Sequence, residues 1–490
     1  MSLYHHISGH VTDPAGVRLT LKDLKQVHMI GIGGVGMSAL AHILMKQGVG
    51  VSGSDRTESS LTHRLVREGA QIYIGHASSH VDQPDLVVYS AAVPPDNPER
   101  TAAVEKGIPQ VDRAVLLGVV VREYDQSVSV AGSHGKTTTT AMLSMLMEWG
   151  GLDPTILVGG ELEPIGGNVK VGKSPVLVTE ACEYQASFLQ FPTRIGLVLN
   201  IDLDHLDYFR DLPAIQAVFA QFARQLPPDG VLIMPATDAN SRALANAATC
   251  RVISFGVEAP HAHLSAMDLE PEADGCWSFR LYQQGLDLGR MRLGIPGKHN
   301  VHNALGAIAV SLELGLHPDS LRPLLPRFTG IHRRFEQRGF WAGVTVIDDY
   351  AHHPAEITVT LEAARSILHQ REIPGDSMAG RLICIFQPHT YTRTHALLKE
   401  FAATLATADL VVVTDIYAAR EPDRNLVHSR DLTALIQQQG SGAVYAPSDQ
   451  DAARVVGNAA RPGDLVLTLG AGPVDQAIPF LQALLEKPKN

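Results

Sequence analysis

The sequence predicts an α/β protein of three domains, each built on a mostly parallel sheet. The chain has 490 residues, which is too long for one hydrophobic core and suits three domains of ordinary size. Short apolar runs alternate with helical patterns along most of the chain, as they do in parallel sheets whose strands are joined by helices. Two glycine-rich turns each follow an apolar run and precede a helical pattern, which is how α/β proteins hold phosphate groups.

The first domain is expected over residues 1–122. Its apolar runs lie at residues 27–32, 49–51 and 85–89. Residues 31–36, at the end of the first run, read Gly-Ile-Gly-Gly-Val-Gly, and Asp55 follows 19 residues after Gly36, at the end of the second expected strand. This G-x-G-x-x-G pattern holds a diphosphate at a helix N-terminus, with the acid beside a hydroxylated group. It therefore predicts a Rossmann-like domain that binds NAD or a UDP-linked substrate, and close helix-to-strand packing without a ligand is the alternative.

The second domain is expected over residues 123–326 and opens with a shortened phosphate-binding loop. The residues expected to bind the nucleotide there are Gly132, Ser133, His134, Gly135, Lys136, Thr137 and Thr138. In such a loop, backbone N–H groups face the phosphates, Lys136 reaches the outer phosphates and Thr137 can hold Mg²⁺. The spacing between the glycines is shorter than in G-x-x-x-x-G-K-[ST], which argues against the common motor and GTPase families. The loop predicts a P-loop ATPase-like domain that binds ATP or GTP, and an ordinary glycine turn is the alternative.

Acidic residues follow the neighbouring strands of this domain. The apolar run 175–180 ends in Glu180, and the run 195–200 leads into a loop that holds three aspartates and His205. The carboxyl ends of parallel strands meet at one edge of a sheet, so these groups are expected beside the phosphates. Thr137 and Glu180 can supply the hard oxygen ligands of a first Mg²⁺ site.

The rest of the second domain and the third domain follow from their patterns. Residues 251–294 alternate between apolar and polar side chains, which predicts an antiparallel addition to the sheet. The third domain is expected over residues 327–490 and is predicted to be Rossmann-like. Its apolar runs lie at 344–348, 382–386, 410–414 and 465–469. The last run ends in the small-residue turn 470–473, which approaches a ligand or simply joins a strand to a helix.

Two more polar clusters indicate binding sites. Asn300 and Asn303 lie one turn apart at the start of a helical pattern, which suits hydrogen bonding to a base edge, and N-capping by Asn300 is the alternative. Residues 347–356 end an apolar run with a dense group of titratable side chains. This second cluster is expected to open the site of the third domain.

Composition excludes several classes of function. The formal net charge is −11, with 45% hydrophobic and 19% charged residues, so no basic surface for nucleic acid is expected. The four cysteines show no C-x-x-C spacing, which favours a reducing compartment. Neither a signal-peptide pattern nor an apolar run of about 18 residues occurs, so we expect a cytoplasmic protein without a membrane partner.

Seven motifs occur in the order found in the Mur ligases, which this chain resembles from about residue 27 to about residue 472. They are GIGGVGMS (31–38), GSHGKTTTT (132–140), DHLD (204–207), HNVHNA (299–304), RRFE (333–336), DDYAHHP (348–354) and FQPHTYTRT (386–394). The last two have the form found in members that act on L-alanine. The resemblance implies ATP-dependent ligation of L-alanine to UDP-N-acetylmuramate through an acyl phosphate, with Mg²⁺, in peptidoglycan precursor synthesis.

Other readings explain fewer motifs. An NAD-dependent oxidoreductase accounts for the first motif alone, and a non-catalytic nucleotide-binding regulator leaves the third domain's polar cluster without a use. Within the family, the main alternative is the ligase that reattaches a recovered tripeptide to the same sugar nucleotide. A monomer or weak homodimer is expected, with its domains closing around the small-molecule substrates.

The resemblance also implies roles for individual residues. Catalysis is assigned to Lys136, His205 and Arg334, and Mg²⁺ to Thr137, Glu180 and His205. Further residues expected to bind the nucleotide are Asn300, Asn303, Arg334 and Asp349. Those expected to bind L-alanine are Tyr350, His352, His389 and Arg393. The UDP-sugar is assigned to Gly33, Gly34, Gly36, Ser38, Asp55, His76, Ser90 and His134. His205 and His352 are both candidates for the base that deprotonates the amine.

This chain departs from the commoner family pattern at several positions near the expected site. Ser133 stands where many relatives have threonine, which keeps the hydroxyl. Cys182 and Gln185 stand where acidic residues are common, and Thr390 stands where a second arginine is frequent. Glu180 is therefore the safest metal ligand, and Arg393 alone is left to hold the amino-acid carboxylate.

Overall fold

The computed structural model describes residues 20–204, 208–371, 380–419 and 421–487. His205 and Asp207, both singled out in the sequence, lie outside these residues. The chain forms two compact units. One extends to Ser265 and includes Gln283–Gly285 and Ala304–Leu324, and the other comprises Ala266–Tyr282, Leu286–Asn303 and the chain from Leu325 onward.

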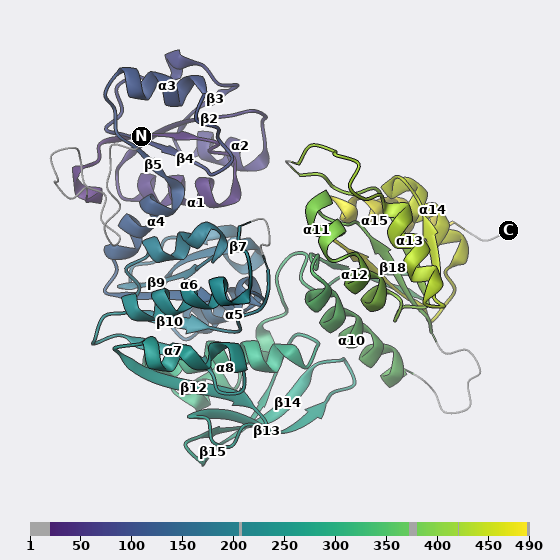
Figure 1. The fold of residues 1–490 in the computed structure, drawn as a ribbon. Helices are drawn as coiled ribbons and strands as arrows, with labels where there is room; N and C mark the ends of the chain where they lie inside the picture. Colours follow the sequence, from purple (N-terminus) through teal and green to yellow (C-terminus); the bar gives the residue numbers. More distant parts are fainter. Residues whose placement is uncertain (1–19, 205–207, 372–379, 420, 488–490) are drawn as a thin grey trace. The chain divides into compact units, whose positions relative to one another are not determined.

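The first sheet has five parallel strands in the order β3-β2-β1-β4-β5 (Figure 1). The strands are β1 (Gln26–Ile30), β2 (Gly50–Asp55), β3 (Gln71–Ile74), β4 (Leu86–Tyr89) and β5 (Gln110–Asp112). The helices are η1 (Leu21–Asp23), α1 (Val35–Lys46), α2 (Ser60–Arg67), η2 (Ser78–His80), α3 (Pro98–Glu105) and α4 (Arg113–Arg122). Val27 and Met29 of β1 share a core with α1 and α4, whereas Ile30 packs with α3. Helices cover both faces of β1, which explains its continuous apolar run.

The second sheet has ten strands in the order β15-β14-β13-β12-β11-β10-β6-β9-β7-β8. The strands are β6 (Gln126–Ala131), β7 (Thr155–Leu162), β8 (Gly167–Lys170), β9 (Val176–Glu180), β10 (Ile195–Val198), β11 (Val231–Pro235), β12 (Arg251–Val257), β13 (Leu264–Pro271), β14 (Trp277–Gln283) and β15 (Leu286–Arg292). The helices are α5 (Lys136–Trp149), η3 (Glu163–Ile165), η4 (Tyr184–Gln190), α6 (Leu212–Gln225), η5 (Ala239–Ser241), α7 (Arg242–Ala247) and α8 (His299–Glu313).

One expectation for this sheet was wrong. The antiparallel addition was predicted to begin near Arg251, but β12 pairs in parallel with β11. The strand reads Arg-Val-Ile-Ser-Phe-Gly-Val and is only half-buried along most of its length, so its composition did not distinguish a parallel from an antiparallel strand.

The third sheet has six strands in the order β16-β17-β21-β18-β19-β20, and only β16 runs antiparallel to its neighbour. The strands are β16 (Glu336–Trp341), β17 (Val344–Asp349), β18 (Leu382–Phe386), β19 (Leu410–Val413), β20 (Gly442–Tyr445) and β21 (Leu465–Leu469). The helices are η6 (Leu325–Arg327), α10 (Pro354–Arg371), α11 (Tyr391–Ala396), α12 (Leu398–Leu405), α13 (Ser429–Gln438), α14 (Asp449–Ala459), η7 (Val474–Gln476) and α15 (Ala477–Leu485). The short helix α9 (Pro318–Leu321) precedes them and belongs to the unit that extends to Ser265.

The predicted fold class is confirmed, since three α/β sheet regions with mostly parallel strands follow one another along the chain. Most central strands were found from sequence because their apolar runs are buried on both faces, but β7 and the fully buried β11 were not predicted. Short or half-exposed edge strands such as β3, β8 and β20 were not found, since they lack such runs. In the part of the chain that the structure describes, no helix combines the length and the apolar character that a membrane crossing requires.

Candidate active site

The phosphate-binding loop joins the end of β6 to the start of α5. Gly135 occupies the N-cap position with a φ of 83°, a left-handed conformation that glycine adopts without steric cost. The helix then begins at Lys136, so its unpaired N–H groups and the positive end of its dipole lie at the loop. The structure thus forms the strand, turn and helix that the motif predicted.

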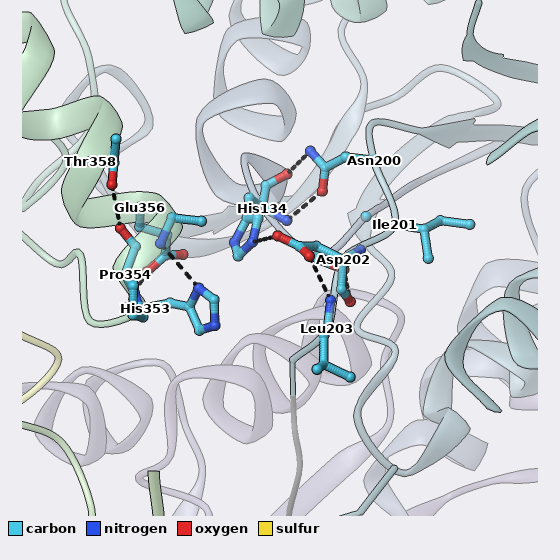
Figure 2. A network of polar contacts seen from close by, with 12 residues as sticks. His134, Asn200, Ile201, Asp202, Leu203, His353, Pro354, Glu356 and Thr358 are labelled. Atoms are coloured by element: carbon cyan, nitrogen blue, oxygen red, sulfur yellow. Dashed lines mark hydrogen bonds and ion pairs between the residues drawn. The ribbon is translucent and has the colours of Figure 1, made fainter. Parts of the chain in front are cut away.

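The loop is fastened to the segment that follows β10 (Figure 2). The Asn200 side chain accepts a hydrogen bond from the His134 N–H at 2.8 Å and donates to the His134 carbonyl at 3.0 Å. The Ser133 hydroxyl donates to the Asp202 carbonyl at 3.1 Å and accepts from the Asp202 N–H at 2.9 Å. Asn200 therefore binds the backbone of the loop. The two bonds of Ser133 explain why a hydroxyl is retained at position 133.

Lys136 is paired with an acid that follows β9. Its ammonium lies 2.9 and 3.1 Å from the two carboxylate oxygens of Glu183 and donates to the Ser133 carbonyl at 3.1 Å. Burial alone would lower the pKa of Lys136, but the Glu183 carboxylate outweighs burial and raises it above the usual lysine value. Lys136 therefore carries a full positive charge, as a group that neutralises phosphate oxygens must.

Thr137 and Glu180 are in direct contact. The Thr137 hydroxyl donates to Glu180 Oε2 at 3.2 Å, and the Gly159 N–H donates to Glu180 Oε1 at 2.6 Å. A hydroxyl beside a carboxylate is the hard oxygen set that suits Mg²⁺. Among the described residues, no group of three or more His, Cys, Asp or Glu is arranged to hold a metal ion. His205, the third ligand that the family resemblance implies, lies outside the described residues, so the structure describes only the Thr137 and Glu180 part of this site.

The segment between Glu180 and α6 carries two of the departures from the family pattern. Burial raises the pKa of the Cys182 thiol, and the neighbouring Glu183 adds to the effect, so the thiol is neutral at pH 7. Gln185 and Ala186 have φ values of 53° and 54°, which residues other than glycine rarely adopt. The segment folds back on itself, and the Cys182 carbonyl accepts hydrogen bonds from the Phe188 N–H and from the Ser187 hydroxyl.

The G-x-G-x-x-G turn after β1 is held by β2. The Gly33 N–H donates to Asp55 Oδ2 at 2.8 Å, and a Cβ at Gly33 would lie 2.8 Å from the same oxygen. The Ser54 carbonyl accepts the N–H groups of Gly31 and Ile32 at 2.8 and 3.0 Å. Glycine at position 33 therefore permits the close approach of Asp55, and this acid supports the turn directly.

His134, which the sequence also assigned to the sugar nucleotide, lies in the loop between β6 and α5, whereas the other expected residues follow the strands of the first sheet or lie in the first turns of α1. His76 follows β3 and Ser90 follows β4, and the Ser90 hydroxyl lies 3.1 Å from the Cβ position of Gly31. Gly34 caps α1, and Gly36 lies in its first turn. Ser38 differs, because it is buried and its hydroxyl donates to the Val35 carbonyl. The sugar-nucleotide role of these residues stays a prediction.

A buried acid that the sequence did not reveal lies against the first sheet. Glu99 of α3 has no exposed surface, and it accepts a hydrogen bond from the Ser54 hydroxyl at 2.6 Å. The imidazoles of His28, His76 and His80 lie 3.1, 3.5 and 2.9 Å from its oxygens. Burial by itself would raise the pKa of Glu99, but the hydrogen bonds from His28, Ser54 and His80 lower it to about 2. The sequence did not indicate this role, because a single glutamate in a helical pattern is usually exposed to solvent.

Asn300 and Asn303 lie in the first turn of α8. Both are buried, and the Asn303 amide donates to Asn300 Oδ1 at 3.0 Å. Asn300 in turn donates to the Pro296 carbonyl at 2.6 Å. The two amides therefore form one connected pair, and Asn300 lies inside the helix, which begins at His299.

Arg334 and Asp349 meet at the end of β17. The Arg334 guanidinium lies 4.9 Å from the centre of the Tyr350 ring, in a cation–π contact. The Asp349 carboxylate accepts the N–H groups of Phe335 and Ala351, each at 2.7 Å. Burial raises the pKa of Asp349 to about 6, although Arg334 and the two N–H donors act in the opposite direction. Asp349 thus supports the turn that carries Arg334, and its ribose role stays a prediction.

Three of the four residues expected to bind the amino acid form a chain of ring contacts, and the fourth, Arg393, lies in α11. The ring of His352 lies 5.4 Å from Tyr350 and 5.6 Å from His389. Tyr417, which the sequence did not indicate, lies 5.7 Å from His389. Burial lowers the pKa of His389 to about 4, and His352 and Arg393 add to the effect, so its imidazole is neutral at pH 7.

Local hydrogen bonds fix the segment that leads into α10, where Figure 2 shows His353, Pro354 and Glu356 close together. Glu356 Oε2 accepts the N–H groups of His352 and His353 at 3.1 and 3.3 Å. His353 Nδ1 accepts the Ala355 N–H at 3.3 Å. These bonds pair N–H groups at the N-terminus of the helix that have no partner within it, and they fix the backbone that carries His352.

Three domain families match the chain in order. They are "Mur ligase family, catalytic domain" at residues 26–125, "Mur ligase middle domain" at 130–311 and "Mur ligase, glutamate ligase domain" at 333–472. The chain belongs to the Mur ligase family. The family assignment that the seven motifs indicated is therefore confirmed.

Within the Mur ligase family, the chain is similar to proteins named as UDP-N-acetylmuramate–L-alanine ligases. The chain is 49% identical, over 92% of its length and 95% of the relative's, to the UDP-N-acetylmuramate–L-alanine ligase of Alkaliphilus metalliredigens. It is 46% identical, over 94% and 97%, to the enzyme of that name from Caldanaerobacter subterraneus. Among solved structures, the UDP-N-acetylmuramate–alanine ligase of Thermotoga maritima matches with a TM-score of 0.78 and 28% identity, over 94% of this chain and 98% of that one.

Proposed function

We propose that this chain joins L-alanine to UDP-N-acetylmuramate, with ATP converted to ADP and phosphate. The observation that carries the proposal is the 49% identity to a UDP-N-acetylmuramate–L-alanine ligase over almost the whole of both chains. The contacts of the phosphate-binding loop support it, since Lys136, Thr137 and Glu180 are gathered at the N-terminus of one helix. The product is the first peptide-bearing precursor of peptidoglycan.

The reaction takes place in two displacements. A carboxylate oxygen of the muramate attacks the γ-phosphorus of ATP, the bond from that phosphorus to ADP breaks, and an acyl phosphate forms. The amine nitrogen of L-alanine then attacks the acyl carbon, phosphate leaves with the electrons of the broken C–O bond, and the amine loses a proton. Phosphoryl transfer of this kind depends mainly on positioning and charge neutralisation.

The loop residues neutralise charge in the first displacement. The Lys136 ammonium, which Glu183 holds in the described structure, exchanges that carboxylate for phosphate oxygens when ATP binds. Thr137 and Glu180, with His205, would hold Mg²⁺, which when bound would add positive charge at the phosphates. Arg334 supplies a guanidinium for the same oxygens, and Asn300 and Asn303 bind the adenine.

The third sheet supplies the residues for the amine substrate. Arg393 pairs with the carboxylate of L-alanine, and the aromatic chain of Tyr350, His352 and His389 lines its pocket. His389 is neutral at pH 7, so its imidazole can accept a hydrogen bond from the ammonium or the amine. The UDP-sugar lies on the first sheet, at the turn braced by Asp55.

The wider setting forms part of the same proposal. All four cysteines are free thiols, which fits a protein that works in the reducing cytoplasm. Its partners are then small molecules, and a monomer or weak homodimer suffices because each described unit carries its own core.

Phosphate release tests the proposal. With ATP, Mg²⁺ and UDP-N-acetylmuramate present, we expect release that depends on added L-alanine, and Lys136→Ala is expected to abolish it. Absence of amino-acid-dependent release from the unaltered protein would overturn the proposal. Faster release with L-Ala-γ-D-Glu-meso-diaminopimelate than with L-alanine would assign the chain to the tripeptide ligases instead.

A further inference from the structure

The turn that carries Arg334 has an unusual backbone. Arg333 and Phe335, which flank Arg334, have φ values of 59° and 52°. Bulky side chains rarely adopt this left-handed conformation, because Cβ crowds the backbone, and glycine or asparagine usually takes such positions. Two such residues around one arginine persist only where neighbouring contacts hold the turn in place.

The Arg333 side chain supplies such contacts, because three nitrogens of its guanidinium donate hydrogen bonds. Its Nε donates to Asp348 Oδ2 at 2.9 Å, while Nη1 and Nη2 donate to the carbonyls of Gly472 and Gly470 at 2.9 and 2.8 Å. Asp348 is fully buried, and its other oxygen accepts the Thr468 hydroxyl at 2.5 Å. Arg333 therefore joins the end of β17 to the small-residue turn after β21, whose use the sequence left open.

The backbone of the turn is fastened on both sides of Arg334. The Arg333 carbonyl accepts the Tyr350 N–H at 2.7 Å, and the Phe335 N–H donates to Asp349 at 2.7 Å. The Arg333 N–H donates to Glu336 Oε2 at 2.9 Å. The Arg334 side chain lies on the Tyr350 ring, outside this set of bonds.

We propose that Arg333 is a positioning residue that fixes the turn so that Arg334 is presented to the phosphates of ATP in one orientation. The proposal rests on the proposed function, in which Arg334 contacts those phosphates. Arg333 itself contacts protein groups, since its fork is engaged by Asp348 and two carbonyls. Its planar fork is the feature that matters, because a lysine keeps the charge but cannot bridge the three acceptors at once.

Arg333→Lys tests this role. We expect kcat to fall about 10- to 100-fold, with KM for L-alanine and for the sugar nucleotide changed less than twofold. Arg381→Lys is the matched control, because Arg381 also engages one buried aspartate, Asp464, and one carbonyl, but at the amino end of β18. The control is expected to lower the melting temperature by a similar amount and to leave kcat unchanged. Equal kcat losses in the two variants, or no loss in Arg333→Lys, would overturn the proposal.

A double-mutant cycle separates positioning from an independent contribution. If Arg333 acts through Arg334, then Arg333→Lys changes kcat less than twofold in an Arg334→Lys background. Losses that multiply would overturn the proposal. If the unaltered protein shows no L-alanine-dependent phosphate release, the proposed function fails by itself. The same cycle is then measured on the dissociation constant of Mg-ATP, where non-additive losses support the role of Arg333 and additive losses overturn it.

Discussion

At the scale of single residues, Glu180 carries the clearest prediction about metal dependence. It is the one strand-end carboxylate in contact with the Thr137 hydroxyl among the described residues, and its other oxygen is held by the Gly159 N–H. Glu180→Gln keeps the shape but removes the charge that a divalent cation requires. We expect the Mg²⁺ concentration for half-maximal phosphate release to rise about tenfold or more. Glu163→Gln, on an exposed residue after β7, is the control and should leave the Mg²⁺ dependence unchanged.

Glu99 carries a prediction about pH. Its pKa is lowered from 4.5 to about 2 in the folded protein, so the folded state favours the ionised carboxylate. A lowered carboxyl pKa contributes stability above the unfolded value, and this contribution is lost as pH falls from about 4.5 toward 2. The size of the shift corresponds to about 3 kcal/mol at neutral pH.

Glu99→Gln is therefore expected to lower the free energy of unfolding by up to about 3 kcal/mol at pH 7, and by progressively less below pH 4.5. Urea unfolding of both proteins across this range measures the difference. Glu105→Gln, at the end of the same helix and exposed, is the control. A difference that stays constant with pH would contradict the ionised state of Glu99.

At the scale of elements, α11 begins with a strained residue. Thr390 has a φ of 64° and a ψ of 145°, a conformation that glycine adopts almost alone, and its side chain makes no capping hydrogen bond. Thr390→Gly relieves this strain and keeps the backbone bond to the Tyr417 carbonyl. We expect the free energy of unfolding to rise by about 1 kcal/mol.

Thr392→Gly is the comparison for this prediction. Thr392 lies inside α11, and its N–H and hydroxyl both bond to Glu421. Glycine there loses the hydroxyl contact and adds backbone entropy to the unfolded chain, so it should destabilise the protein. Chemical unfolding of the two variants measures the change in the free energy of unfolding. We expect it to rise in Thr390→Gly and to fall in Thr392→Gly, and a fall in both would contradict backbone strain at Thr390.

The same scale explains what could be predicted from the sequence. Strands such as β10 and β21 were found because both their faces are buried, and the loop before α5 was found because glycine, lysine and threonine occur at a spacing that phosphates require. Glu99 and Tyr417 were missed, and Arg333 was noted only as part of a motif without a role, for a common reason. Each contacts residues that are far away in the chain, so only the fold reveals that an ordinary arginine, glutamate or tyrosine supports the site.

At the scale of the whole molecule, the two nucleotide substrates are assigned to different sheets. The sugar nucleotide is assigned to the turn braced by Asp55 on the first sheet, and ATP to the loop of Lys136 on the second. A ligand that binds only the folded state raises its stability by about 2.7 kcal/mol when its concentration is 100 times its dissociation constant. Each ligand is therefore expected to raise the melting temperature through its own set of residues.

Two variants test this independence. Lys136→Ala should lose the melting-temperature shift caused by Mg-ATP and keep the shift caused by UDP-N-acetylmuramate. The substitution removes a charge from the phosphate-binding loop and leaves the turn on the first sheet unaltered. Gly33→Ala should show the reverse, since its Cβ would meet Asp55 Oδ2 at 2.8 Å and displace the turn on the first sheet. Thermal melts of both variants with each ligand measure the four shifts. Loss of both shifts in one variant that melts normally without ligand would show that the two sites are coupled, and that the substrates do not bind independently.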